Sequence, residues 1–237
     1  MTRVVQPLGS KGSLKWIQRA VNDRWDALDQ PILAKLPGAT GIEWRSPLEA
    51  DNFAEYRDGE FLDRIGLTRL RPALKEFWPE RGPQWDALGL SDRGDVLLVE
   101  AKAHVAEMCS PGTAAGPESR QRINRALVAC ADHLGARTSR AAWTDHFYQL
   151  ANRIAHLHFL REHSVPAYLV LVNFLNDPDM KGPTTPEVWE AAYEVAFHVM
   201  GLPKRHPLAR YMVEVFPDVS AANYNFIRVG HGGVTDA

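Results

Sequence analysis

The residues of this chain whose types and spacing could do chemistry are Asp86, Glu100 and Lys102. They lie in two short apolar runs separated by residues 91–95, a Ser-Asp-Arg-Gly-Asp sequence that is typical of a turn. If this turn closes a hairpin centred on Arg93, antiparallel pairing brings Asp86 opposite Glu100, and Lys102 follows on the same face. A slip of one residue would send Asp86 to the other face.

Two opposed carboxylates in an apolar sheet repel each other and lose hydration, so they need a cation or a proton. Mg²⁺ (or Mn²⁺) suits Asp86 and Glu100 because it takes oxygen ligands, and the carbonyl of Ala101 could supply another. Lys102 could orient a water or stabilise charge on a phosphate. The chemistry predicted is metal-assisted hydrolysis of a phosphodiester; the alternative is a structural ion pair at a strand end.

The same residues resemble a known motif. Asp86 followed by Glu100-Ala101-Lys102 on a hairpin is similar to the signature of the PD-(D/E)XK, or restriction-endonuclease-like, nuclease superfamily. The family's Pro-Asp is loosened here to Pro83-Gln-Trp-Asp86, whereas its Glu-X-Lys is intact. The resemblance covers about residues 47–175. It implies a Mg²⁺-dependent nuclease that acts on DNA, with a core ordered helix, three strands, helix, strand.

The resemblance also implies further site residues. The superfamily often adds an acid from its first helix, for which Glu49, Glu55 and Glu60 are candidates, and we select Glu55 because it lies mid-helix. On a later helix, Gln149 and Arg153 are spaced i and i+4 and resemble the polar pair that the family presents to its metal site. Arg153 suits phosphate through its planar fork. An ordinary solvated helix face would give the same pattern.

The chain also contains histidines and two cysteines that could do chemistry. His104 alternates onto the Glu100 face and could contact phosphate, although a strand-end histidine would look the same. The histidines His156, His158 and His163 contain no i, i+4 pair, so they do not suggest a metal site. Cys109 and Cys130 cannot form a disulfide scaffold or a four-cysteine zinc site.

The expected fold is α/β: a small mixed central sheet flanked by helices, with a restriction-endonuclease-like α-β-β-β-α-β core and extra helices at both ends. One domain is expected over residues 1–237, its core at 47–175, with an N-terminal helical and a C-terminal helix-strand elaboration. Apolar periodicity predicts the following elements. Helices are expected at 13–29, 46–66, 67–77, 118–134, 139–163 and 186–201, and strands at 85–90, 96–104, 166–175 and 211–216. The family's first strand has no clear signal and is placed at 77–84, and the tail after Arg228 is expected to be loose.

Composition limits the function classes. The chain has 27 Lys and Arg against 29 Asp and Glu, a net charge of −2, which disfavours a strongly basic nucleic-acid binder. Residues 118–162 carry seven arginines and a local charge of +3, since the acids there number four (7 − 4), so they are the best candidate for a phosphate-facing surface. No apolar run approaches a bilayer's thickness or a secretory signal, so we expect a cytoplasmic protein without a membrane partner.

Three functions fit these patterns. The first is a Mg²⁺-dependent nuclease whose partner is nucleic acid, DNA first. The second is a non-catalytic nucleic-acid-binding or scaffolding protein on the same fold, which the near-neutral charge favours. The third is a small-molecule hydrolase, which would need a closed apolar pocket. A homodimer is compatible with all three.

Overall fold

The computed structural model describes residues 2–137 and 142–221. The strands are β1 (Arg3–Val4), β2 (Ile42–Ser46), β3 (Glu55–Tyr56), β4 (Ala87–Ser91), β5 (Val96–Lys102), β6 (Ala167–Asn173) and β7 (Met212–Val215). The longer helices are α1 (Gly12–Asn22), α2 (Asp26–Leu33), α3 (Asp58–Arg64), α4 (Arg71–Phe77), α5 (Pro117–His133), α6 (Tyr148–Glu162) and α7 (Pro186–Val199). Short helical turns are η1 (Glu49–Asp51), η2 (Thr68–Leu70), η3 (Val105–Met108), η4 (Ala142–His146) and η5 (Ala209–Tyr211).

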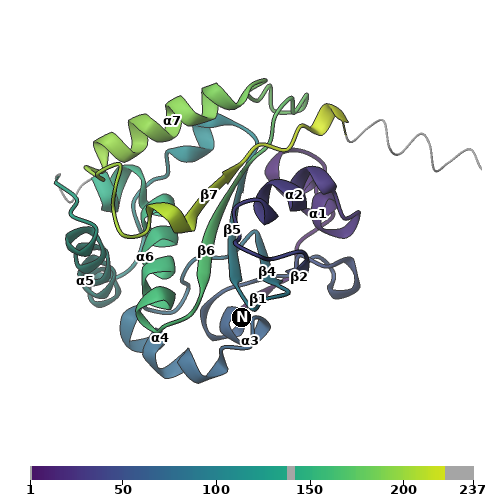
Figure 1. The fold of residues 1–237 in the computed structure, drawn as a ribbon. Coiled ribbons are helices and arrows are strands. Elements are labelled where there is room, and N and C mark those ends of the chain that lie inside the picture. Colours follow the sequence, from purple (N-terminus) through teal and green to yellow (C-terminus); the bar gives the residue numbers. More distant parts are fainter. Residues whose placement is uncertain (1, 138–141, 222–237) are drawn as a thin grey trace, which may run out of the picture.

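A mixed sheet of five strands, in the order β2-β4-β5-β6-β7, forms the centre of the molecule (Figure 1). β2, β4 and β5 pair antiparallel, and β6 and β7 continue the sheet in parallel. β1 and β3 form a separate two-stranded pair. The predicted class, a mixed α/β fold with a sheet flanked by helices, is therefore confirmed.

The hairpin of β4 and β5 has the register that the sequence predicts. Leu90 pairs with Val96 and Leu88 with Leu98. The turn between them is closed by the Ser91 hydroxyl, which accepts hydrogen bonds from the N–H groups of residues 93 and 95. Ladder pairing, however, ends at residues 87 and 99, one position before Asp86 and Glu100.

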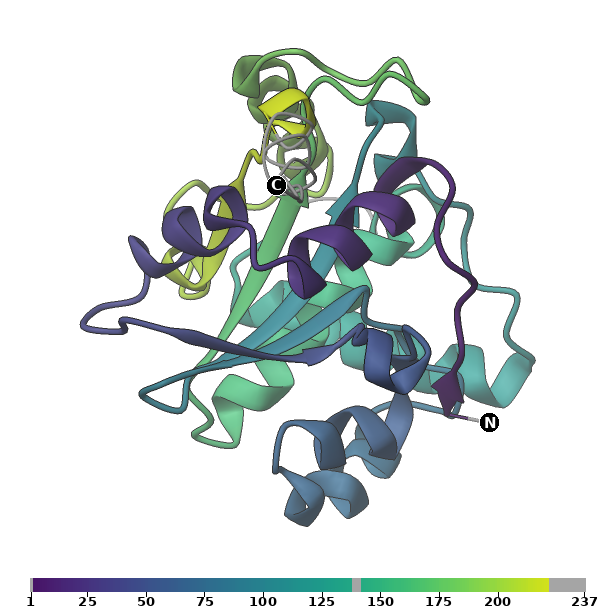
Figure 2. The same ribbon diagram turned by 90° about the vertical axis from the view of Figure 1, so that its right-hand side faces the viewer.

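Helices cover both faces of the sheet, which explains the continuous apolar character of β5 and β6. On one face, Leu98 and Leu169 pack in a core with residues of α5, α6 and α7. On the other, Leu97 and Val170 pack with residues of α1 and α2, which lie in front of the sheet in Figure 2. Every residue of β5 and β6 is buried.

The predicted helix at 46–66 is wrong, and so is the placement of a first strand at 77–84. In the five-stranded sheet, the first strand along the chain is β2, whose alternating Ile42, Trp44 and Ser46 pair with β4. The Trp44 ring lies against Gly89, where an added Cβ would come within 3.1 Å of it. After β2 the chain turns at Asn52 and Phe53, both with positive φ, and a helix begins only at residue 58.

Other predicted elements shift at their ends. The expected helix at 13–29 is two helices, α1 and α2, because the chain takes a positive φ at Arg24 between them. Within the expected helix at 139–163, α6 begins at Tyr148 and the π-helical turn η4 precedes it. Residues 139–141 and the tail after Arg228 lie outside the described residues. None of the helices in the described part of the chain is long and apolar enough to cross a membrane.

Candidate active site

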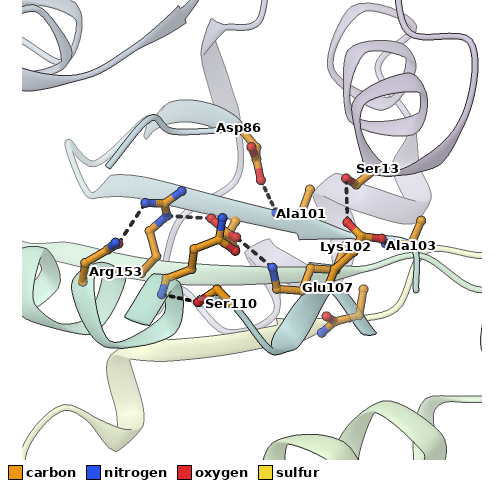
Figure 3. Close-up of polar contacts among 12 residues, drawn as sticks. Ser13, Asp86, Ala101, Lys102, Ala103, Glu107, Ser110 and Arg153 are labelled. Atoms are coloured by element: carbon orange, nitrogen blue, oxygen red, sulfur yellow. Dashed lines mark hydrogen bonds and ion pairs between the residues drawn. The ribbon is translucent and has the colours of Figure 1, made fainter. Parts of the chain in front are cut away.

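The predicted site residues gather where β5 ends and β4 begins, under the buried helix α6. Glu100 and Lys102 come from β5, and Asp86 from the residue before β4. Arg153 reaches the same strand from α6 (Figure 3). Glu55 approaches from β3, which lies next to this region because Tyr56 bridges to Trp85.

Glu100 is the centre of this cluster and is bound by two cations. Its Oε1 accepts a hydrogen bond from Lys102 Nζ at 2.9 Å, and its Oε2 accepts one from Arg153 Nε at 2.6 Å. All three side chains are about 6% exposed. Burial alone would raise the pKa of Glu100, but the charges and hydrogen bonds of Arg153 and Lys102 lower it to about 2. Glu100 is therefore ionised at any physiological pH.

Asp86 continues the hairpin through its side chain. Its Oδ2 accepts a hydrogen bond of 2.7 Å from the N–H of Ala101 (Figure 3). Since the N–H and C=O of one strand residue point to the same neighbouring strand, the Ala101 carbonyl is directed to this edge as well. The pKa of Asp86 is raised well above its usual value, first by burial and then by the nearby charges of Glu100 and Glu55.

Glu55 lies beside the cluster, although not on the helix that was expected to carry it. It is 4% exposed and accepts hydrogen bonds from Gln6 Nε2 at 2.8 Å and from Gln84 Nε2. Burial raises its pKa, while the two glutamine donors and Arg153 oppose that shift. The main-chain oxygen of Gln84 also accepts from Arg153 Nη2 at 2.7 Å. Gln84 thus joins Glu55 to Arg153.

The two other candidates lie at the margin of the cluster. Gln149 is exposed, and its main-chain N–H donates to Ser110 Oγ at 2.9 Å. Among the described residues, no contact joins the Gln149 side chain to Glu100, so its role in the site remains a prediction. His104 Nδ1 accepts a hydrogen bond of 3.1 Å from Ala106 N and so caps the helical turn η3. Its predicted contact with phosphate remains untested.

The described arginines of residues 118–162 do not all lie on one exposed surface. Arg153 is 5% exposed and is bound to Glu100, so it does not face solvent as part of a basic patch. Arg120 and Arg122 use their side chains to bind the main-chain oxygens of Thr113 and Lys75. Arg140 lies outside the described residues.

The polar face expected on the helix after β5 is also largely buried. Asn152, His156 and His158 are each at most 5% exposed. Burial lowers the pKa of His156 to about 3, and its ring packs against Trp78 and Trp85. His156 is therefore a neutral core histidine.

Sequence reasoning missed several polar neighbours of the cluster. Asn173, the residue of β6 that pairs with Lys102, is fully buried and accepts a hydrogen bond from Tyr193 at 3.0 Å. Glu107 accepts from the N–H of Ala103 and from the hydroxyl of Ser13. Asn173 ends a buried apolar strand, which is a usable signal. No sequence pattern connects Gln6 with Glu55, 49 positions away, or Ser13 with Glu107, 94 positions away.

The cluster contains oxygen atoms that could bind a metal ion. Asp86, Glu55 and Glu100 provide carboxylates and Ala101 a carbonyl, the oxygen ligands that Mg²⁺ prefers. In the side-chain positions described, both oxygens of Glu100 are bound by cations, and the described residues contain no group of three acidic, histidine or cysteine side chains arranged to hold a metal ion. The residue types fit Mg²⁺ through two carboxylates, one carbonyl and water, and not through a preformed three-residue cage.

Comparisons with known proteins add no assignment to this geometry. No family model matches the chain, and no curated protein or solved structure matches it.

Proposed function

We propose that this protein is a Mg²⁺-dependent nuclease of the restriction-endonuclease-like class, acting on DNA. The observation that carries the proposal is the charge of the cluster. Among the described residues, three buried or half-buried carboxylates, Glu55, Asp86 and Glu100, gather with two cations, Lys102 and Arg153. An apolar interior does not keep an excess negative charge unless a proton or a cation offsets it.

The order of elements supports the same class. Helices α1 and α2 precede the antiparallel strands β2, β4 and β5, and α5 and α6 then lead to β6, which is parallel to β5. This order of helix, three strands, helix and strand is the one that the motif implies, although its first helices and first strand lie before residue 47, where the expected core begins. The helices α3 and α4 are an insertion between the first two of these strands.

In this proposal Asp86, Glu100 and the Ala101 carbonyl hold the metal ion, which when bound lowers the pKa of water and stabilises charge on the phosphate. Lys102 Nζ, 2.9 Å from Glu100, orients the attacking water and offsets the negative charge that develops as it adds. Arg153 has the planar fork that can bind a phosphate oxygen once it is released from Glu100. Glu55 adds a third carboxylate, and its negative charge favours a bound cation.

The test uses the purified full-length chain with single- and double-stranded DNA and RNA, in Mg²⁺, Mn²⁺ or chelator. We expect cleavage with metal only, and a loss of about 10²–10³ in rate for Lys102→Ala, the usual effect of removing one such electrostatic group. Lys75→Ala, which changes an exposed lysine of α4, is the matched control. Glu100→Gln should also weaken Mn²⁺ binding measured by calorimetry. Cleavage that is equal in wild type and Lys102→Ala would refute the proposal.

A second function has its own supporting observation. Every polar atom described at Glu100 is already paired, to Lys102 and Arg153, as expected of a structural network on a non-catalytic nucleic-acid-binding or scaffolding protein. In that case neither Mg²⁺ nor Mn²⁺ would bind with measurable heat. DNA binding would then be unchanged by chelator and by Lys102→Ala, and no substrate would be cut.

A further inference from the structure

The sheet ends at β7 on one side, where no further strand of the described chain pairs with it. β7 is the last strand in the sheet order and pairs only with β6. The N–H of Leu175 donates to Pro217 O, and Val219 N donates to Leu175 O, so odd-numbered residues of this stretch face β6. The main-chain groups of Met212, Glu214 and Phe216 therefore face away from the sheet.

A cavity of about 1160 Å³ lies along this free edge. Its lining includes Met212, Glu214 and Phe216 from the edge itself, Glu190 and Tyr193 from α7, and Lys35 beyond the end of α2. Figure 1 shows β7 in front of β6, with α7 on one side and α2 on the other. An extended chain placed here would meet the unpaired main chain of β7 as a sixth strand.

The opposite edge of the sheet is protected, which makes the opening at β7 significant. β2 carries an irregularity between Trp44 and Ser46, and its exposed Arg45 and Glu43 form an ion pair. The outward carbonyl of Arg45 accepts a hydrogen bond of 2.7 Å from Arg64. A bulge and paired charges are common means of blocking an edge strand. At the β7 edge, the cavity takes the place of such blocking features.

The cavity lining carries both signs of charge, with Lys35, Lys204 and Arg210 beside its acids, and the acids Glu190 and Glu214 indicate which side chain an extended partner would present. Glu214 shares the α7 face of the sheet and is only partly exposed, and Glu190 lies close enough to raise its pKa together with burial. Neither carboxylate has a cation partner among the described residues, whereas the neighbouring Glu194 is paired with Lys204 at 2.9 Å. A lysine or arginine between Glu190 and Glu214 would complete this acidic pair.

We propose that the β7 edge is a docking site for an extended peptide segment of a partner protein, which adds as a sixth strand and places a lysine or arginine between Glu190 and Glu214. Main-chain hydrogen bonds to Met212, Glu214 and Phe216 give affinity, and the acidic pair gives specificity. This is recognition by strand addition. It is independent of the chemistry at Glu100.

The experiment selects binders to the full-length protein from a displayed library of random eight-residue peptides and titrates the best peptide by fluorescence anisotropy. We expect selected sequences rich in Val, Ile and Thr, with a basic residue at one fixed position. Affinity should fall at least tenfold for the Glu190→Gln/Glu214→Gln protein and remain unchanged for Glu194→Gln, the matched control. Methylating alternate peptide nitrogens should abolish binding while keeping every side chain.

Three results would overturn the proposal. The first is that the library yields no binder. The second is that the selected peptides bind the double variant as well as the wild type, and the third is that N-methylation of the peptide does not change its affinity. Analytical sedimentation of the chain alone tests whether a second copy of the chain occupies the β7 edge instead. A dimer that dissociates in the Glu190→Gln/Glu214→Gln variant would show that a second copy, and not a peptide, fills the edge. Circular dichroism of each variant verifies the fold.

Discussion

Two glutamates of the same sheet, Glu100 and Glu214, respond to burial in opposite ways. Glu100 lies between Lys102 and Arg153, and its pKa is lowered to about 2 although burial opposes ionisation. Glu214 lies near Glu190 and has no cation partner among the described residues, and burial with that like charge raises its pKa to about 7. The partner, and not the depth, decides the charge state of each acid. The completed region, around Glu100, is an ion network with its cations in place. The unfilled region, around Glu214, is an acidic pair without a cation among the described residues.

The largest expected effect comes from breaking the completed network. Arg153→Met leaves Glu100 with a single cation and also removes hydrogen bonds to Gln84 and Asn152. We expect a loss of about 3–5 kcal/mol in the free energy of unfolding, measured with urea, because a buried charge loses its partner. Arg161→Met changes an arginine of the same helix that lies over the Tyr211 ring and should cost at most about 1 kcal/mol.

The double variant Arg153→Met/Glu100→Gln separates loss of charge pairing from loss of packing. Because Glu100 no longer carries a buried charge that has lost its Arg153 partner, the double variant should be more stable than Arg153→Met alone. Stability that falls further, by the sum of the two single effects, would show that the Glu100 ion pair is not what Arg153 contributes.

Acid should remove the stabilisation of Glu100. Its folded pKa is depressed, so its contribution is fully present above the ordinary glutamate pKa of 4.5 and is lost as pH falls from there to about 2. The expected size is about 3 kcal/mol, since each pKa unit corresponds to about 1.4 kcal/mol. Urea unfolding across this range should show the decrease in wild type and a smaller one in Glu100→Gln. Equal slopes would contradict the paired geometry.

Glu214 should show the opposite sign and a smaller step. Its folded pKa is raised, so it contributes most below the unfolded value of 4.5 and loses that contribution as pH rises to about 7. Because Glu214 is partly exposed, solvent screening reduces the expected change in its unfolding free energy to about 2 kcal/mol. Thermal unfolding from pH 5 to 8 should show a decline in wild type that is absent in Glu214→Gln. A decline that persists in the variant would assign it to other groups.

The sequence predicts the completed region better than the unfilled one. The five-residue turn at 91–95 and two apolar runs determine the register of β4 and β5, and with it the proximity of Glu100 and Lys102. Local turn chemistry and side-chain alternation are sufficient for such a pair. Glu214 lies on the last strand with the same alternation, but its cavity depends on α7 and residues 202–210 packing beside it.

The errors arise where tertiary packing overrides local pattern. Glu55 was assigned to a helix, yet it lies on β3 because residues 3 and 4 pair with it, a contact across about fifty residues. Arg153 is expected from the sequence to offer its fork to phosphate or to lie on a solvated helix face, whereas α6 is covered on nearly all sides and Arg153 is bound to Glu100. A single helix period cannot reveal that both faces are buried. The strand β2 did carry a signal, the alternation of Ile42, Trp44 and Ser46.

The smallest effect tests whether the two regions act independently. Tyr193 lies between them: its hydroxyl donates to Asn173 beside the Glu100 cluster, and its pKa is raised by burial, then by Glu214 and Glu100. Tyr193→Phe removes one buried hydrogen bond and should cost about 1–2 kcal/mol in unfolding free energy. If the regions are independent, Tyr193→Phe and Glu100→Gln add to within about 0.5 kcal/mol, as do Tyr193→Phe and Glu214→Gln. A coupling above that value in both cycles would mean that Tyr193 transmits between the cavity and the cluster, and the two acids would then be parts of one network.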